Sequence, residues 1–227
     1  MTIAACAPVA PGRATSTGLR LSGFGVFRAD VDGVAALLPP ISRTMLARLV
    51  LARGALVYAD DLYRDSWPDP APVIRREQRV GVHKRIAELR RFLVPGGDTG
   101  TTMLLTERSA RTGYRLLLDD DRVDLHVFTD LVFRAAAVRD AVAVDLLTRA
   151  LAMWTERPLL GLPDRAFVAD RVCWLTNLRD RACRELAATC AALGRPRDAL
   201  AALDRLQAGH PDDGGLRDLT DRLRGDR

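Results

Sequence analysis

The sequence predicts a mainly α chain in two parts, an N-terminal α+β unit followed by an all-α unit. Three observations predict this fold class. Residues 19–118 alternate short strand-like and helix-like segments, whereas residues 123–227 form a succession of amphipathic helical segments. Within the second part, AALGRPRDALAALDRLQAGHP at residues 191–211 has the form of a helix–turn–helix unit. Such units stack into helical domains similar to tetratricopeptide repeats.

Composition and charge narrow the possible partners. The chain has 227 residues, 48% hydrophobic and 28% charged, enough for one large domain or two small ones. A pI of 9.5 favours nucleic acid or another acidic partner, although 33 of the 34 cationic residues are arginine, as in GC-rich genomes. Residues 1–118 hold 17 cationic and 10 acidic side chains, and residues 119–227 hold 17 and 19. An acidic partner is therefore expected to bind to residues 1–118.

The first half is predicted to fold as a strand, three helices and a hairpin. Ser42 is expected to cap the first helix, and Gly54 follows its end. Asp60 and Asp61 suit the positive end of the second helix. The predicted segments are a strand at 19–27, turn residues at 28–33, helices at 43–53, 59–67 and 74–93, and strands at 101–107 and 113–118.

The third predicted helix, Ile74–Leu93, carries seven cationic side chains and two acidic ones. At 100° per residue, Val82, Ile86, Leu89 and Leu93 form one apolar seam that must pack against other helices. A basic hairpin, RSARTG between two strands, follows directly, which a merely solvated helix face does not predict. This order is typical of a winged helix, whose third helix enters the major groove while the hairpin, the wing, reaches toward the DNA backbone or minor groove.

Eleven residues are candidates for DNA contact, with a solvated helix face as the alternative. Arginines around the seam favour phosphate contacts, and the side opposite the seam favours base edges. We expect phosphate contacts from Arg75, Arg76, Arg79, Arg90 and Arg91, base-edge contacts from His83, Lys84, Ala87 and Glu88, and wing contacts from Arg108 and Arg111. Four to six phosphate contacts predict a slope of log K against log[salt] of about −4 to −5.

Other functional classes lack their motifs. No nucleotide-binding, nucleophile-elbow or zinc-protease motif is present, and the histidines are scattered over separate elements, so we expect neither an enzyme nor a cofactor or metal. The cysteines show no metal-ligand spacing and are interpreted as small buried hydrophobes in a reducing cytosol. They are Cys6, Cys173, Cys183 and Cys190. Trp67, Trp154 and Trp174 are likewise expected in the core.

A cytoplasmic location is expected for the chain. Residues 1–18 lack a basic segment followed by a sustained apolar run, so they are interpreted as a disordered tail and not as a signal peptide. No segment is long and apolar enough to span a membrane.

Five motifs, in this order, carry a family resemblance. They are RGALVYADDLYRDSW ending in Trp67, ELRRFL with Leu89, Arg90, Arg91 and Leu93, TGYRL with Gly113 and Tyr114, VDLHVF at Val123–Phe128, and ALAMW ending in Trp154. Together they resemble the SARP family (Streptomyces antibiotic regulatory protein) of actinobacterial activators. The match extends from about Leu19 to the end of the sequence.

The resemblance implies the architecture and the function. Residues 19–118 would form an OmpR-type winged-helix DNA-binding domain, and residues 123–227 a C-terminally short bacterial transcriptional activation domain. The protein would bind direct repeats in double-stranded promoter DNA as a homodimer and recruit RNA polymerase through its sigma or alpha subunit. It would thereby activate a secondary-metabolite gene cluster.

Some residues depart from the family pattern. Glu88 and Ala110 stand where the family usually has arginine, Ala87 stands at a common Ser or Arg position, and Gly81 lies inside the recognition helix. Glu88, Gly81 and the short C-terminal part keep an alternative open, in which a degenerate winged helix no longer binds DNA specifically and the chain is a protein-interaction regulator.

Overall fold

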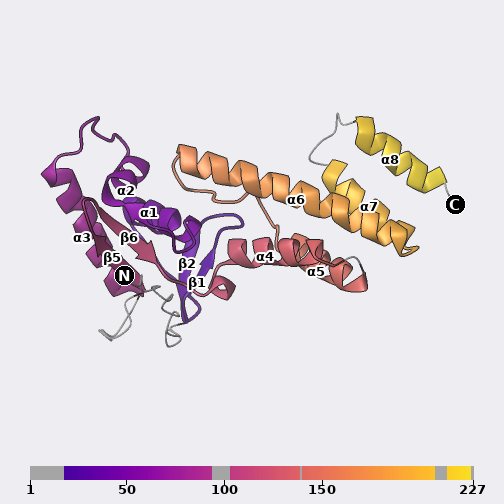
Figure 1. Cartoon of the computed structure of the whole chain (residues 1–227), viewed down its shortest axis with the longest axis horizontal. Helices are drawn as coiled ribbons and strands as arrows, with labels where there is room; N and C mark the ends of the chain where they lie inside the picture. The colour runs from indigo at the N-terminus through magenta and orange to yellow at the C-terminus, as the bar shows by residue number, and fades with distance from the viewer. Residues whose placement is uncertain (1–17, 94–102, 139, 208–213, 226–227) are drawn as a thin grey trace, which may run out of the picture.

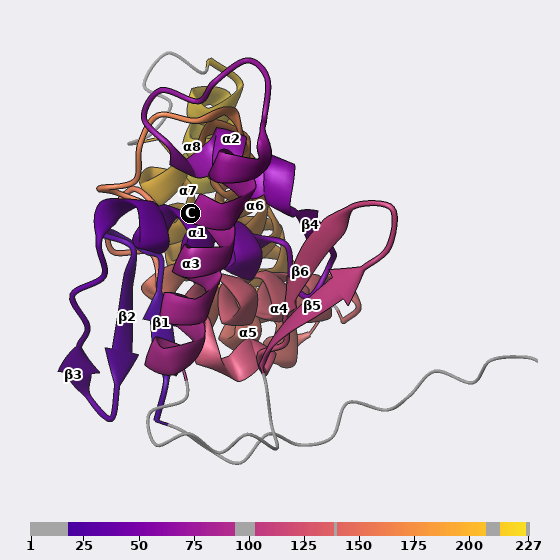
Figure 2. The same cartoon turned by 90° about the vertical axis from the view of Figure 1, so that its left-hand side faces the viewer.

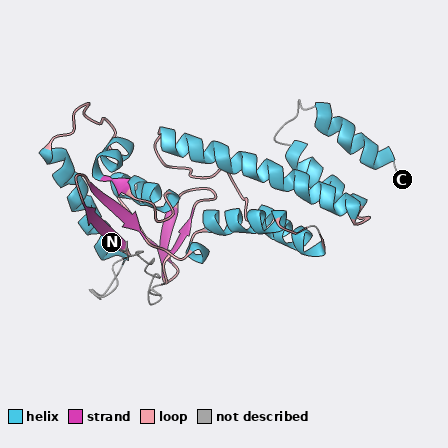
Figure 3. Ribbon diagram, viewed as in Figure 1, coloured by secondary structure: helices cyan, strands magenta, loops and turns pink. Residues whose placement is uncertain are grey.

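A computed structural model describes residues 18–93, 103–138, 140–207 and 214–225 of the chain (Figure 1). Helices dominate it, with small sheets confined to the first half (Figure 3), so the predicted mainly α fold class is confirmed. The predicted tail lies almost wholly outside the described residues. In chain order the elements are β1 (Arg20–Ser22), β2 (Arg28–Val31), β3 (Val34–Ala35), α1 (Pro40–Leu51), β4 (Val57–Tyr58), α2 (Ala59–Ser66), α3 (Arg76–Leu93), β5 (Leu104–Arg108), β6 (Thr112–Leu116), the 3-10 turn η1 (Asp120–Arg122), α4 (Asp124–Ala136), α5 (Ala141–Ala152), α6 (Ala166–Ala192), α7 (Pro196–Gln207) and α8 (Gly214–Gly225).

The first half has the predicted winged-helix order. Strands β1, β2 and β3 form an antiparallel sheet, helices α1 to α3 follow, and a second antiparallel sheet has the order β4–β6–β5. The β5–β6 hairpin is the predicted wing, in register from Leu104 opposite Leu116 to Arg108 opposite Thr112. Its strand β6 also pairs with β4. The wing is thereby tied to the helices it accompanies.

Helix α3 is oriented by its apolar seam. Val82, Ile86, Leu89 and Leu93 are buried, as the spacing predicts, and α3 packs against α1 and α2. Burying each of these side chains contributes on the order of 1.5–3 kcal/mol. Because the seam occupies one side of the helix, the cationic side remains on the surface.

The prediction of one strand over Leu19–Phe27 is wrong. Strand β1 ends at Ser22, and Gly25 adopts a φ of 84°, which bends the chain. Phe24 and Val26, on either side of the bend, lie outside the first sheet and form isolated bridges with Pro158 and Leu160. The predicted turn at residues 28–33 is also misplaced, because β2 occupies Arg28–Val31 and the turn is confined to residues 32 and 33.

Ser42 does not cap α1. The helix begins two residues earlier at Pro40, since a proline at the first helical position has the φ that a helix needs. Ser42 is therefore a buried residue of the first turn, with 1% of its surface exposed. Gly54 beyond the end of the helix has a φ of 76°. The residues whose spacing predicts one apolar stripe on this helix are buried, namely Met45, Leu46, Leu49 and Val50.

The second half consists of helical hairpins. α4 packs on α5, α6 on α7, and α8 lies against α7 (Figure 1). Cys183 and Cys190 are buried on α6, as predicted, but Cys173 is exposed. Trp67 and Trp154 pack against the core, whereas Trp174 is 38% exposed. Both misassigned residues lie on the N-terminal part of α6, which extends beyond the hairpin it shares with α7.

The two halves are joined through the segment between β1 and β2. The Asp124 carboxylate, at the start of α4, accepts hydrogen bonds from the backbone N–H of Gly23 at 2.8 and 2.9 Å. The ring of Phe24 packs against Phe128 and Trp154, with ring centroids 5.3 and 5.1 Å away. Burial raises the pKa of Asp124, although the backbone N–H groups it binds act in the opposite direction. The hydrophobic core is continuous across this junction.

A buried histidine lies at the junction between the two halves. Nε2 of His126 on α4 lies 3.2 Å from the carbonyl oxygen of Val50 on α1. Its Nδ1 lies 2.9 Å from the Asp120 carboxylate. Burial and then the positive charge of Arg53 lower the pKa of His126 below its ordinary value of 6.5, although Asp120 opposes this.

We expect acidification to weaken the fold through His126. The folded protein binds this proton less tightly than the unfolded chain does, so the stabilisation is present above pH 6.5 and is lost as the pH falls below it. Urea unfolding at pH 7.5 and 5.5 measures the loss, and His126→Gln should make it smaller. An unchanged difference between the two pH values in the variant would contradict the assignment.

Replacing Gly81 should stabilise the protein. Gly81 is a helical residue, and a Cβ there would lie 3.4 Å from Cζ2 of Trp67, an ordinary van der Waals contact. Gly81→Ala should raise the free energy of unfolding by about 0.5–1 kcal/mol, measured by chemical denaturation. Gly54→Ala is the contrasting control, because its positive φ should make the same substitution destabilising.

Candidate nucleic-acid interface

The exposed side of α3, together with the wing, forms one surface at one end of the molecule, where α3 lies beside the β5–β6 hairpin (Figure 2). Nine of the eleven predicted contact residues are exposed on it, while Glu88 and Arg90 are partly buried. The exposed ones are Arg75, Arg76, Arg79, His83, Lys84, Ala87, Arg91, Arg108 and Arg111. Arg75 lies just before the helix, where its backbone N–H donates to the Gln78 side chain.

Arg79 is tied to a neighbouring helix. Its guanidinium donates from Nε and an Nη to both carboxylate oxygens of Asp60 on α2, at 2.8 and 3.1 Å. These hydrogen bonds lower the pKa of Asp60. A bidentate pair of this kind fixes the guanidinium in one direction. Arg79 therefore presents less net charge to a ligand than its sequence position suggests.

Arg90 is bound to the wing. Its Nε donates to the carbonyl oxygen of Leu104 at 2.9 Å, and an Nη donates to the Thr106 hydroxyl at 2.6 Å, both on β5. The arginine thus sets the position of the wing relative to α3. The sequence motif that contains Arg90 gives no sign of this role, because the partner strand lies 14 residues or more away.

Glu88 also has a partner within α3. Its carboxylate accepts a hydrogen bond from Arg85 at 2.7 Å, which lowers its pKa. The pair is partly exposed, and ion pairs of this kind contribute little stability. The pair matters for the charge of the surface, because the negative charge of Glu88 is balanced by Arg85. Arg85 is not among the residues predicted to contact DNA.

The middle of the exposed side holds the remaining cations and one unexpected residue. Arg76, Lys84 and Arg91 lie along it, and Nε of Arg91 donates to the Ala87 carbonyl oxygen at 3.3 Å. Val80 lies between them and is 56% exposed. Val80 is not among the eleven residues predicted to contact DNA. The sequence offered one signal for such a contact, which is an apolar residue among charged residues on the polar side of a helix.

The arginines of the wing lie on a hairpin that contacts β4 and the loop after α1. The guanidinium of Arg111 lies 4.1 Å from the centre of the Tyr58 ring on β4, a cation–π contact. Arg108 is the last residue of β5 and is exposed. Arg115 donates to Glu107 across the hairpin and, at 3.0 Å, to the carbonyl oxygen of Gly54. The hairpin is thereby held against the loop that follows α1.

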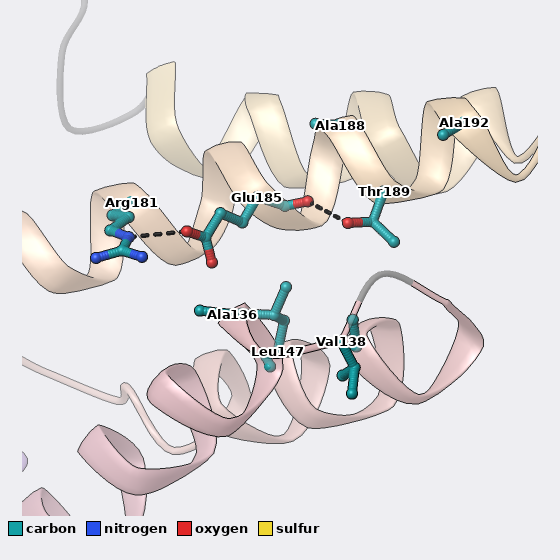
Figure 4. A pocket seen from close by; sticks show the side chains of 10 residues that line it. Ala136, Val138, Leu147, Arg181, Glu185, Ala188, Thr189 and Ala192 are labelled. Atoms are coloured by element: carbon teal, nitrogen blue, oxygen red, sulfur yellow. Dashed lines mark hydrogen bonds and ion pairs between the residues drawn. The ribbon is translucent and has the colours of Figure 1, made fainter.

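A second concave feature lies between the α4–α5 hairpin and α6 (Figure 4). It has a volume of about 320 Å³, and five of its ten lining residues are alanines. Arg181 and Glu185 form an ion pair along it at 2.8 Å. The Thr189 hydroxyl donates to the Glu185 carbonyl oxygen, so the polar side chains of the lining already have partners within α6.

The described residues include neither a membrane-spanning helix nor a metal-binding cluster. Among the described residues, no helix combines the length and the apolarity needed to span a membrane. Residues 18–225, apart from the undescribed gaps, contain no group of three or more His, Cys, Asp or Glu side chains arranged to hold a metal ion.

Comparison with known proteins shows what the chain is similar to. Residues 123–219 match the model of the bacterial transcriptional activator domain. The chain is 34% identical over 212 residues to the transcriptional regulatory protein MoaR1 of Mycobacterium bovis, covering 87% of this chain and 63% of that protein. It is 31% identical over 214 residues to the regulatory protein AfsR of Streptomyces coelicolor, covering 90% of this chain and 20% of AfsR. These matches agree with the resemblance of the chain to the SARP family. The relatives are named as regulatory proteins, in line with the expectation that the chain is not an enzyme.

A solved structure supports the fold. Mycobacterium tuberculosis EmbR, determined in complex with a low-affinity phosphopeptide, superposes with a TM-score of 0.62 at 24% identity, covering 93% of this chain and 66% of EmbR. The likeness concerns the fold. The chain spans less than two thirds of the length of MoaR1 and a fifth of AfsR.

Removing Arg90, which is bound to the wing, should lower the free energy of unfolding more than removing the exposed Arg91. Arg90→Ala breaks two hydrogen bonds of a partly buried guanidinium and should cost about 1–2 kcal/mol of unfolding free energy. Arg91→Ala, the matched neighbour on the exposed side, should change it by less than about 0.5 kcal/mol. Equal losses in a urea titration would show that Arg90 does not position the wing.

Proposed function

We propose that the chain is a transcriptional activator that binds double-stranded promoter DNA through α3 and the wing. The observation that carries this proposal is the exposed cationic side of α3, oriented by a buried seam and flanked by a basic wing. An α-helix fits the major groove, which is about 12 Å wide. The wing then lies where it can reach the phosphate backbone.

Individual residues take different roles in this proposal. Arg75, Arg76 and Arg91, with Arg108 and Arg111 on the wing, contact phosphates. His83, Lys84, Ala87 and Val80 face base edges, where the apolar side chains suit a thymine methyl group. Arg79 and Arg90 act mainly by holding α3 against α2 and the wing, because their guanidinium groups are bound there. Glu88 contributes through Arg85 or accepts from a cytosine amino group.

The wider assignment follows the family. Residues 19–118 serve as the DNA-binding domain and residues 123–227 as the activation domain, which contacts RNA polymerase. Two copies of the chain bind promoter direct repeats about one helical turn apart, in the cytoplasm. The target is a secondary-metabolite gene cluster, which the likeness to AfsR supports.

DNA binding should be specific and strongly dependent on salt. Fluorescence anisotropy with promoter fragments from the neighbourhood of the gene, against scrambled DNA, should give a slope of log K on log[salt] of about −4 to −5 for four to six phosphate contacts. Arg76→Ala combined with Arg91→Ala should weaken binding and reduce the steepness of the slope by about 2.

The matched control removes two exposed arginines from the helical half, Arg134 on α4 and Arg149 on α5. It lowers the net charge equally and should leave the slope unchanged. If the unmodified protein binds promoter fragments no better than scrambled DNA at low and moderate salt, the proposal is wrong. The protein-interaction alternative would then be the better description of the chain.

A further inference from the structure

The loop between α2 and α3, residues 67–75, leads directly into the recognition helix and has little hydrogen bonding of its own. Three of its nine residues are prolines, which have no backbone N–H to donate. The backbone N–H of Ala71 donates to the Tyr63 hydroxyl at 3.3 Å. The path of residues 67–75 into α3 therefore depends on contacts with other parts of the chain.

An arginine of the helical half supplies such contacts. An Nη of Arg165 donates to the backbone carbonyl oxygens of Trp67 and Pro68, the latter at 2.9 Å. These residues are 97 and 98 positions away in the sequence. Hydrogen bonds from a charged donor to a carbonyl are stronger than neutral ones. Arg165 thus fixes the first two residues of the loop.

Arg165 itself projects from a rigid position. It is the residue before α6, and its carbonyl oxygen accepts from the N–H groups of Val168 and Ala169 in the first turn. The same part of α6 is attached to α1, because Arg171 donates to the carbonyl oxygen of Leu51 at 2.9 Å. In Figure 1 this end of α6 lies beside α1 and α2.

Trp67 carries the constraint to α3. Its indole packs against the Tyr63 ring, with centroids 4.9 Å apart. Its Cζ2 atom lies 3.4 Å from the point where a Cβ of residue 81 would be, so the ring rests on α3 where glycine leaves the helix surface bare. Gly81 is one residue from Val80 and three from Lys84, both on the exposed side. Movement of Trp67 would therefore displace the part of α3 that carries these side chains.

We infer that Arg165 is a positioning residue of the recognition helix, so that recognition of DNA depends on the helical half of the chain. This inference rests on the proposed function for its consequence at DNA. Its structural content, that Arg165 holds the loop and α3 in place, can be measured without DNA.

The experiment compares Arg165→Ala with Arg157→Ala in the full chain. Arg157 lies in the same loop between α5 and α6 with an exposed side chain, so both variants lose one positive charge from one region. Hydrogen–deuterium exchange should show faster exchange of the backbone amides in residues 67–75 and in the first half of α3 for Arg165→Ala alone. Affinity for a specific promoter fragment should fall about tenfold in that variant, with the salt slope unchanged because no phosphate contact is removed.

Arg165→Lys keeps the charge and one donor group but not the planar guanidinium, and it should give intermediate exchange and affinity. It carries the test if the alanine variant fails to fold. Equal exchange in the Arg165 and Arg157 variants would overturn the inference. Faster exchange in a protein that binds no DNA would support the positioning role and show that the proposed function is wrong.

Discussion

The rest of the structure depends on the junction in which the chain between β1 and β2 pairs with the loop between α5 and α6. The N–H of Leu159 donates to the carbonyl oxygen of Gly23, and the N–H of Phe27 donates to that of Leu160. Asp124 accepts from the backbone on one side of this pairing, and the ring of Phe24 fills the core beneath it. Backbone groups buried in this way need partners, so separating the halves would leave several without them. The helical half and the winged helix therefore hold each other in place.

This junction explains which parts of the fold the sequence could predict. The seam of α3, the wing and the stripe of α1 follow from local periodicity, because each side of a helix or hairpin is set by residues a few positions apart. The strand at residues 19–27 was predicted wrongly because its second part pairs with residues more than 130 positions away. Alternation of apolar and small residues indicates an extended chain and does not identify its partner. Likewise, the exposure of Trp174 depends on where α6 leaves its hairpin partner.

The sequence could predict which side of α3 is exposed. It could not predict which of the charged side chains on that side are free to bind a ligand. Sequence periodicity placed the cations of α3 beside the seam or opposite it, and most of them are exposed in the structure. It could not show that Arg79 faces Asp60, or that Arg90 binds β5, because these partners come from other elements. The number of cations on a helix therefore overstates the charge available to a ligand. The positions that retain it lie along the middle of the exposed side, around Val80.

Two of the three departures of α3 from the family pattern, Glu88 and Gly81, make contacts within the fold. Glu88 is paired with Arg85, so its negative charge is matched by a cation of the same helix and adds little repulsion of its own toward a phosphate. Gly81 lies under the indole of Trp67, in the contact that joins α3 to the loop bound by Arg165. The matched charge of Glu88 weakens the case for a degenerate winged helix. Gly81 does not decide between the two interpretations, because an alanine would also fit beneath the indole.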